Sequence, residues 1–401
     1  MDRKEEFMYR KTYVEVNLDN IEYNTKQLLN TYNKYEYYFG VVKGFAYGHG
    51  FNIINTLINN GINYLAVSNL QEALEIRKIN KEVPVLCLEP IDYEHLELCS
   101  INNITITVSS TRYAKLLETW PLKLKIHIKI DSGMNRLGFD NSKDLESALK
   151  LLKTNNNLTL EGIYTHMGTL GISDPYWDRQ LEEFKRITQS TDLNEFKIIH
   201  IDRSATMMCH EKIDFCNGVR MGLALYGYNQ FKKQPKSLKN KFKQIRKYFK
   251  IKKYNISKTN TEINLKLKPA MSLITEVIEI KTVKKGEFIG YFGHVNNEPE
   301  IKVATASIGY ADGIDLRATG APVFINGKRF KIIGTINMGM ISIQVDNSIK
   351  PGDKVEIFGN NIKINETSSH VNTTIYETMT TISPLLPRVY INNNISGNEE
   401  E

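Results

Sequence analysis

The chain has 401 residues, of which 41% are hydrophobic and 24% charged, a composition typical of a soluble globular protein with room for two domains. The sequence has no uninterrupted run of about 18 apolar residues, the length that a membrane-spanning helix needs. The start MDRKEEFMYRK lacks the apolar core of a signal peptide. The four cysteines form no CxxC pair and no disulfide framework, so we expect a reducing, cytoplasmic setting.

The net charge of +7 comes from one segment. Residues 232–268 contain 13 Lys, one Arg and one Glu, which leaves a net charge of −6 for the rest of the chain. Charge runs are usually faces turned to water, so we interpret 229–265 as a solvated basic insertion or linker. Contact with anionic lipid or RNA is the alternative, and no nucleic-acid partner is expected.

Short apolar runs alternate with helical spacing over the first half of the chain, and the helical spacing is clear at 69–79 and 144–153. Such alternation predicts a parallel sheet with right-handed crossovers. Eight strand-like units in about 190 residues favour a (β/α)₈ barrel of the TIM type. An open doubly wound sheet is the alternative, although no GxGxxG opens a helix. The eight units are 37–43, 64–69, 83–88, 104–108, 124–130, 160–166, 196–202 and 218–227.

The pattern changes after about Lys268. Strand-like runs separated by Gly, Asn and Asp turns replace the helical spacing and predict a mostly antiparallel β domain. The run TYVEVNLD alternates cleanly, and we expect it to pair with this late domain. The predicted parts are an N-terminal tail (1–11), that strand (12–19), the barrel (20–228), the basic insertion (229–265), the β domain (266–391) and a polar tail (392–401).

Lys43, in VVKGFAYGHG, follows an apolar strand and precedes a glycine-rich turn. Folds of this class place their chemistry at such strand ends, and a desolvated lysine forms Schiff bases with carbonyl cofactors. Tyr47 lies four residues further on, within reach of whatever Lys43 holds. A lysine that merely extends its charge to water at a strand end is the plain alternative.

Polar residues also follow the later strands of the predicted barrel. The Ser204 hydroxyl and the backbone N–H groups at Gly222 and Leu223 are suited to bind a phosphate. Arg136 is suited to bind a carboxylate. Arg220 is costly to bury alone and needs a partner such as a ring nitrogen. The set predicts a site for an anionic, ring-bearing cofactor and a carboxylate substrate. Its members are Lys43, Lys129, Asp131, Arg136, His166, Asp202, Ser204, Arg220 and Gly222.

Each of these residues has a structural explanation when taken alone. His166 is then a satisfied core histidine, and Arg136 is a surface ion-pair partner. Ser204 is then only the cap of a helix that begins at Ala205. The functional interpretation rests on their common place at the ends of successive strands.

The motifs resemble those of alanine racemases. VEVNLDNIEYN, VVKGFAYGHG, IHIKIDSGMNRLGF, LEGIYTHMGT, VRMGLALYG, LKPAMSL, IGYFG, ASIGYADGI, IIGTINMG and LPRVY occur in the family's order over essentially the whole chain. The resemblance implies a (β/α)₈ barrel joined to a β domain. It also implies pyridoxal 5′-phosphate as cofactor and a homodimer with shared active sites.

The resemblance also implies roles for single residues. Lys43 would hold the cofactor covalently and act as one base, while Tyr291, reaching in from the partner subunit, would be the base on the opposite face. Arg136 would bind the cofactor's phenolate oxygen and orient the substrate carboxylate. Arg220 would donate to the pyridine nitrogen. Lys129 matches a lysine that is carbamylated in many relatives, and a carbamate there would hold Arg136.

Further residues are assigned by the same resemblance. His166 would contact Tyr291 and the cofactor ring, Tyr310 would line the entrance, and the backbone of Met338 would help bind the substrate carboxylate. The phosphate ligands would be Tyr47, Ser204, Gly222 and Leu223.

Several positions depart from the family pattern. Gly44-Phe45 stands for Ala-Asn, Arg203 for Asn, Asn337-Met338-Gly339 for Cys-Met-Asp, and Pro384 for a tyrosine. These changes bear on the substrate more than on the cofactor. The expected function is the conversion of L-alanine to D-alanine for peptidoglycan precursors. A serine or broad-specificity racemase is one alternative, and an inactive cofactor-binding regulatory homologue is an alternative of another class.

Overall fold

The computed structural model describes residues 9–170, 174–229, 263, 265–291 and 294–392. The chain divides into two compact units, each treated by itself. The barrel unit comprises Glu22–Lys43 and Ile54–Lys268, and the β unit comprises Met1–Ile21, Gly44–Ile53 and Pro269–Glu401. The predicted basic insertion at 229–265 lies almost wholly outside the described residues, as do most of the predicted tails 1–11 and 392–401.

Eight parallel strands close into a barrel in chain order. Closure is made by the first and last strands, where Phe39 lies opposite Arg220. A closed barrel has no free sheet edge, and it gathers the carboxyl ends of all its strands at one end. The predicted TIM-type barrel is confirmed. Its strands are β2 (Tyr37–Val41), β3 (Tyr64–Val67), β4 (Val85–Cys87), β5 (Ile104–Val108), β6 (Leu124–Lys129), β7 (Leu158–Tyr164), β8 (Ile198–Arg203) and β9 (Gly218–Met221).

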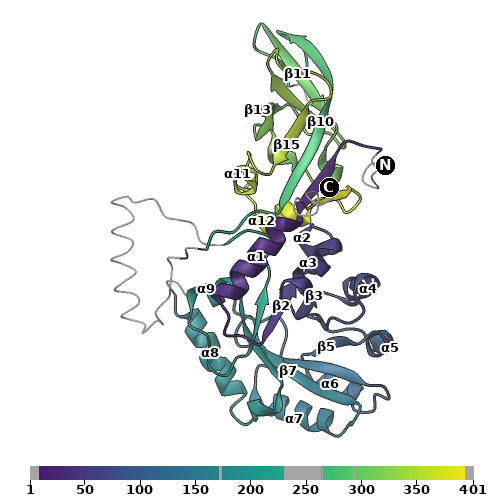
Figure 1. Ribbon diagram of the computed structural model, residues 1–401, viewed down its shortest axis with the longest axis vertical. Coiled ribbons are helices and arrows are strands. Elements are labelled where there is room, and N and C mark those ends of the chain that lie inside the picture. The colour runs from purple at the N-terminus through teal and green to yellow at the C-terminus, as the bar shows by residue number, and fades with distance from the viewer. Residues whose placement is uncertain (1–8, 171–173, 230–262, 264, 292–293, 393–401) are drawn as a thin grey trace, which may run out of the picture. The chain divides into compact units, whose positions relative to one another are not determined.

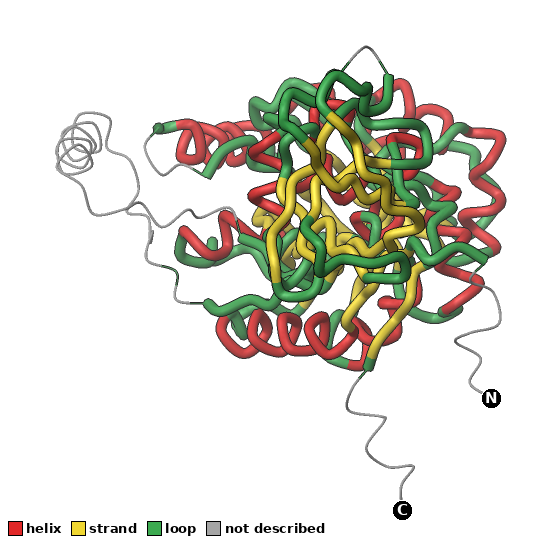
Figure 2. Tube along the Cα trace, turned by 90° about the horizontal axis from the view of Figure 1, so that it is seen from above, coloured by secondary structure: helices red, strands yellow, loops and turns green. Residues whose placement is uncertain are grey.

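Helices lie outside the barrel strands (Figures 1 and 2). They are α3 (Ile54–Asn59), α4 (Leu70–Ile79), α5 (Leu96–Ile101), α6 (Thr111–Leu117), α7 (Ser142–Lys153), α8 (Tyr176–Ile187) and α9 (Ser204–Cys209), with the short turns η2 (Tyr93–His95) and η3 (Leu193–Glu195). In α7 the residues Leu145, Leu149 and Leu152 are buried on one face, and Asn141 caps the start by accepting from the Asp144 N–H at 2.9 Å. Each buried leucine stabilises the packing by roughly 1.5–3 kcal/mol.

The β unit contains one eight-stranded sheet, in the order β11-β14-β13-β12-β15-β10-β1-β16. Its pairs are antiparallel except β1 with β16, so the predicted mostly antiparallel β domain is confirmed. The N-terminal strand β1 pairs with β10, with Tyr13 opposite Ile274. The strands are β1 (Tyr13–Asn17), β10 (Met271–Lys284), β11 (Glu300–Ala306), β12 (Pro322–Ile325), β13 (Lys328–Ile333), β14 (Ile341–Val345), β15 (Lys354–Phe358) and β16 (Arg388–Ile391).

Short helical elements in the β unit were not expected from the sequence. They are α11 (Ile364–His370) and α12 (Ile375–Thr380), together with the turns η1 (Phe51–Ile53), η4 (Tyr310–Asp312) and η5 (Leu316–Ala318). The two helices are rich in Ser and Thr and bury few side chains, so they carry almost no helical period. The helix α1 (Leu18–Thr31) begins in the β unit and continues in the barrel unit.

The segment after Lys43 forms a left-handed turn, labelled α2 (Lys43–Tyr47). Gly44, Phe45 and Ala46 have φ between 53° and 63° and ψ between 45° and 52°. This hand costs roughly 1–2 kcal/mol for each residue with a Cβ. Later residues hold the turn in place, because Tyr390 donates to the His49 carbonyl at 3.0 Å and Arg388 donates to the Gly48 carbonyl at 3.0 Å.

The turn generates a prediction about Gly48. An alanine Cβ at this position would lie 2.2 Å from the Met379 carbonyl oxygen, in a backbone with φ +79°. Gly286 has φ +89° and open space around its Cβ position, so it is a matched control. Gly286→Ala should lower the free energy of unfolding by about 1–2 kcal/mol through backbone strain alone, and Gly48→Ala should lower it by clearly more. Urea unfolding of the two variants checks this, and equal losses would contradict the assigned close approach.

Candidate functional site

Lys43 lies two residues after the end of β2 and is half-buried. Desolvation lowers the pKa of its amine, and the positive charge of Arg136 lowers it further. Glu72 and Glu89 oppose the effect but do not reverse it. A lysine with a lowered pKa has more of the neutral amine, which is the nucleophilic and basic form.

Lys129 ends β6 and is buried. Its Nζ donates to the Ile130 carbonyl at 3.2 Å and lies 4.8 Å from the centre of the Tyr164 ring. Burial and then the charge of Arg220 hold the pKa of this amine well below its usual value. The barrel therefore brings Lys129 into the same electrostatic environment as Lys43, Arg136 and Arg220.

Arg220 is only 3% exposed, and its burial requires hydrogen-bond partners, as we expected. Its guanidinium donates to the carbonyls of His200, Thr165 and Ile201 at 2.7–2.9 Å and to Nδ1 of His200 at 2.6 Å. Burial lowers its pKa to about 10, so it remains charged at neutral pH. The chain itself satisfies this buried cation, and any contact with a ligand would be additional.

A polar relay inside the barrel continues from Arg220, and sequence reasoning missed it. Arg220 can only donate, so Nδ1 of His200 accepts and Nε2 carries the proton. That Nε2 donates to Nδ1 of His127 at 2.9 Å, which leaves Nε2 of His127 to donate to Glu161 at 3.3 Å. Tyr64 donates to the same carboxylate at 2.7 Å. The only sequence signal was the presence of His127 and His200 within the strand runs IHIKI and IIHID.

The pKa shifts agree with this direction of donation. Burial lowers the pKa of His127 and holds that of His200 well below its usual value, so both rings are neutral. For Glu161, burial raises the pKa, but the hydrogen bonds from His127 and Tyr64 and the neighbouring charges together outweigh it, so the carboxylate is ionised. The relay thus joins a buried cation to a buried anion through two neutral imidazoles.

Asp131 shapes the loop that carries Arg136. Its carboxylate accepts from the backbone N–H groups of Gly133, Met134, Asn135 and Arg136 at 2.8–3.0 Å. Burial raises the pKa of Asp131, but these four donors together hold it below the ordinary value. Asp131 is therefore an ionised loop residue, and Arg136 itself is exposed.

Ser204 is not the cap of the following helix, contrary to the structural alternative. The helix α9 begins at Ser204 itself, and Arg203 occupies the capping position. The Gly222 N–H donates to the Ser204 hydroxyl at 2.9 Å, which ties the end of β8 to the end of β9. Because the hydroxyl accepts in this bond, its proton remains available for a ligand.

His166 follows β7 and is a neutral histidine. Burial, and then the charges of Arg220 and Lys129, hold its pKa well below the usual value. Asp202 in β8 is buried, and burial raises its pKa. One oxygen of this carboxyl accepts from Tyr35 at 3.2 Å, so Asp202 belongs to the barrel interior.

Four predicted site residues, Tyr47, Tyr291, Tyr310 and Met338, lie in the β unit. The Tyr47 ring centre is 6.0 Å from that of Tyr376 in α12. Tyr291 is 65% exposed. Tyr310 and Met338 are exposed but lie on adjoining loops.

The described part of the chain holds no group of three or more His, Cys, Asp or Glu side chains arranged to bind a metal ion. Within the same residues, no helix combines the length and apolar character required to cross a membrane.

Two family models match the chain. The model for the alanine racemase N-terminal domain matches residues 16–230, and the model for the alanine racemase C-terminal domain matches residues 270–390. The chain belongs to the alanine racemase family. It is therefore an isomerase of the amino-acid racemase type.

Individual relatives agree with this assignment. The alanine racemase of Streptococcus suis is 31% identical over 390 residues, which cover 95% of this chain and 98% of the relative. That of Clostridium novyi is 32% identical over 400 residues, covering 96% of each. The crystal structure of alanine racemase from Bacillus anthracis with bound L-Ala-P matches with a TM-score of 0.84 at 32% identity, again over 96% of each chain.

The electrostatics of Lys43 generate a prediction. Arg136→Gln removes a positive charge that opposes protonation, so the pKa of Lys43 should rise. The protein is first treated with hydroxylamine, which releases any carbonyl compound bound to Lys43. It is then acylated at a series of pH values, and mass spectrometry measures the extent of labelling at Lys43. The Lys43 profile should move to higher pH in the variant, while that of exposed Lys150 stays fixed. An unchanged Lys43 profile would show that the charge of Arg136 does not lower the pKa of Lys43, and it would contradict the prediction.

Proposed function

We propose that this racemase interconverts L- and D-alanine with pyridoxal 5′-phosphate as cofactor and supplies D-alanine for peptidoglycan precursors. The proposal rests on the environment of Lys43, a half-buried lysine at the end of a barrel strand. Burial and the nearby positive charges of Arg136 and Arg220 lower the pKa of its amine. Membership of the alanine racemase family supports the choice of substrate.

The donors present in the barrel unit fit an anionic, ring-bearing cofactor. The positive charges of Arg136 and Arg220 lower the pKa values of Lys43 and Lys129, whereas the carboxylate of Asp131 is occupied by backbone donors. An anionic ligand would relieve this excess of positive charge. When bound, the cofactor supplies an electron sink that makes the substrate α-proton acidic.

We propose for the cofactor and substrate the residue roles that the resemblance to alanine racemases implies. Lys43 offers the amine for a covalent link, and Arg220 offers the ring nitrogen its Nε–H, because His200, Thr165 and Ile201 accept from the other N–H groups. Arg136 would bind the phenolate oxygen and orient the substrate carboxylate, with the Met338 backbone as a second carboxylate ligand. His166 would lie beside the ring, and Tyr310 would line the entrance. The phosphate would be held by Tyr47, Ser204, Gly222 and Leu223.

Racemisation needs one base on each face of the α-carbon. In our proposal, Nζ of Lys43 removes or returns the proton on one face, and the phenol oxygen of Tyr291 does so on the other. Tyr291 is 65% exposed in the single chain, which supports a role completed in a homodimer, where it reaches the other subunit's barrel.

Lys129 fits a carbamylated lysine. Its lowered pKa favours the neutral amine, which is the form that adds carbon dioxide. The carbamate would place a negative charge close to Arg136 and Arg220, which stabilises both guanidinium groups.

The cytoplasm is the compartment that suits this function, since peptidoglycan precursors are made there. The four cysteines support it, because Cys87, Cys99, Cys209 and Cys216 are all free and buried.

Two substitutions favour a second candidate, a serine or broad-specificity racemase. Gly339 has no heavy atom within 4 Å of its Cβ position, and Pro384 is exposed. Neither carries the acidic or phenolic side chain usual in the family. The site would therefore have room for a larger amino acid and would lack a contact that discriminates against it.

Substrate preference is the decisive measurement. We expect the purified protein to be yellow and to convert L-alanine faster than L-serine, as followed by chiral chromatography. Faster conversion of serine would favour the second candidate. A yellow protein without activity would favour the inactive regulatory homologue.

The two bases are tested separately. Lys43→Ala should abolish the visible absorbance and the activity. Tyr291→Phe should keep the absorbance and lose racemisation by about 10²–10⁴-fold, while α-proton exchange in deuterated water survives for one enantiomer only. Racemisation by Tyr291→Phe at the wild-type rate in both directions would contradict the two-base assignment.

Shared sites predict complementation. When Lys43→Ala and Tyr291→Phe proteins exchange subunits, each mixed dimer contains one site with both bases, so activity should recover to roughly a quarter of the wild-type value after random exchange. Each variant exchanged with itself is the control. No recovery despite mixed dimers detected by native mass spectrometry would place both bases of a site in one chain.

A further inference from the structure

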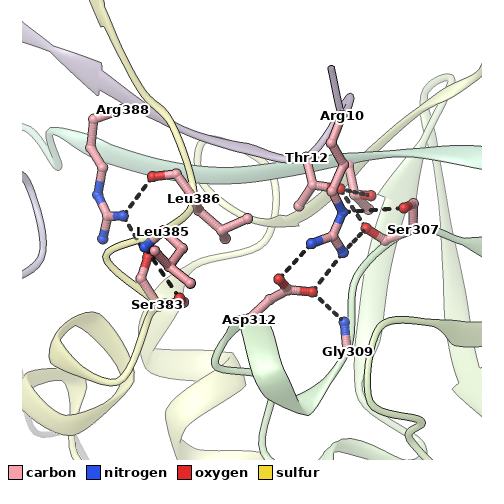
Figure 3. A network of polar contacts seen from close by, with 10 residues as sticks. Arg10, Thr12, Ser307, Gly309, Asp312, Ser383, Leu385, Leu386 and Arg388 are labelled. Carbon is pink, nitrogen blue, oxygen red and sulfur yellow. Dashed lines mark hydrogen bonds and ion pairs between the residues drawn. The ribbon is translucent and has the colours of Figure 1, made fainter. Parts of the chain in front are cut away.

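Arg10, which precedes β1, forms a two-pronged ion pair with Asp312. Its Nη1 lies 2.6 Å from Oδ1 and its Nη2 lies 2.7 Å from Oδ2 of the carboxylate (Figure 3). The same guanidinium donates to the carbonyl oxygen of Ser307 at 2.5 Å and to its hydroxyl at 3.3 Å. This fork geometry is specific to arginine, because a lysine presents only a point charge.

Asp312 is the fixed partner in this pair. It is only 6% exposed, and its Oδ2 also accepts from the Gly309 N–H at 2.9 Å. A carboxylate this deeply buried is strongly destabilised when its cationic partner is removed. The exposed pair between Asp315 and Arg317 nearby is a contrasting case, since such surface pairs contribute little.

Asp312 ends η4, the turn that carries Tyr310, and this turn is bonded to the Met338 loop. The Tyr310 N–H donates to the Asn337 carbonyl at 3.0 Å, and the Ala311 N–H donates to the Met338 carbonyl at 2.9 Å. The loops also touch at Gly309, where a Cβ would lie 2.2 Å from the Asn337 carbonyl oxygen. A displacement of the turn therefore moves Met338 as well.

A third segment is attached to the same residue. The Asp312 carbonyl accepts from the Ser383 N–H at 3.1 Å, directly before Pro384. Arg388 holds the other side of that segment by donating to the carbonyls of Ser383 and Leu386 at 2.5 and 2.7 Å (Figure 3). One half-buried ion pair, with its carboxylate buried, thus joins the three loops that contain Tyr310, Met338 and Pro384.

We infer that Arg10 is a positioning residue for substrate binding, which acts through Asp312 to fix the loops of Tyr310 and Met338. The inference rests on the proposed function for the roles of those two residues. Arg10 is far from them in sequence and touches neither the cofactor ligands nor the two bases assigned above. Its loss should therefore weaken substrate binding without loss of cofactor.

The test compares Arg10→Met with the matched control Arg317→Met, which removes the exposed arginine partner of Asp315. Arg10→Met should raise KM for the amino acid by about 5–10-fold, which is the order expected for the loss of one net hydrogen bond. Its kcat and visible absorbance should stay within about twofold of the wild-type values. Arg317→Met should leave KM unchanged, and Arg10→Lys should restore part of the loss. A KM unchanged in Arg10→Met would overturn the inference, even if the melting temperature falls.

A second measurement does not depend on activity. Amide hydrogen exchange of 309–313 and 337–340 should accelerate in Arg10→Met but not in Arg317→Met. If the wild-type protein racemises no amino acid, the proposed function fails, and this exchange result alone then decides whether Arg10 fixes the two loops. Unchanged exchange in both segments would overturn the inference.

The double variant Arg10→Met/Asp312→Asn serves if Arg10→Met fails to fold, because no charge is then left buried without a partner. It loses the ionic fork but keeps a polar side chain beside Gly309. The same rise in KM and the same faster exchange are expected from it, and wild-type values for both would overturn the inference.

Discussion

The pairing of β2 with β9 is the constraint on which the barrel site depends. It brings the strand that leads into Lys43 next to the strand that carries Arg220, although about half of the chain separates them. Closure of the barrel then places the ends of β6, β7 and β8 around the same opening. Burial, together with the positive charges of Arg136 and Arg220, lowers the pKa values of Lys43, Lys129 and His166 there. The fold of the chain alone therefore favours neutral amines at Lys43 and Lys129 and creates a positively charged site that suits an anion.

The relay behind Arg220 explains how such a charge is tolerated. Its guanidinium is bonded to carbonyl groups and to His200, and two neutral imidazoles lead from there to the ionised Glu161. Each hydrogen bond fixes the tautomer of the next ring, so all the hydrogen bonds donate in the same direction, from Arg220 towards Glu161. The barrel interior is accordingly a polarised path in addition to an apolar core, and it holds Arg220 in one orientation.

The sequence predicted the barrel because its strands and helices have clear periods. The helix expected at 69–79 corresponds to α4, where Asn69 provides the cap, and the eight apolar runs match the eight barrel strands. It also pointed to Lys43, because a lysine between a strand and a glycine turn is distinctive. It did not reveal the roles of His127 and His200, because a buried histidine in a strand looks the same whether or not it is in a relay. The helices α11 and α12 were missed because their few buried side chains leave no period.

The Ser204 result shows a further limit of reading sequence locally. A serine before a helical run has the pattern of a cap, but its hydroxyl is engaged by Gly222 from the next strand. Tertiary contacts decide such cases. For the same reason the ion pair of Arg10 with Asp312 could not be predicted, since nothing near either residue indicates a partner 302 positions away.

The left-handed turn after Lys43 has a consequence for how the protein is made. The side chains that hold this turn, Arg388 and Tyr390, lie 340 and 341 positions after the carbonyl groups they bind. A backbone of the unfavourable hand cannot persist by itself, so it must await these contacts. On the ribosome, the lysine segment emerges early but is locked only when the last strand has been synthesised and paired beside β1. A nascent or truncated chain that lacks its final residues would therefore hold a complete set of barrel strands with an unfixed turn after Lys43.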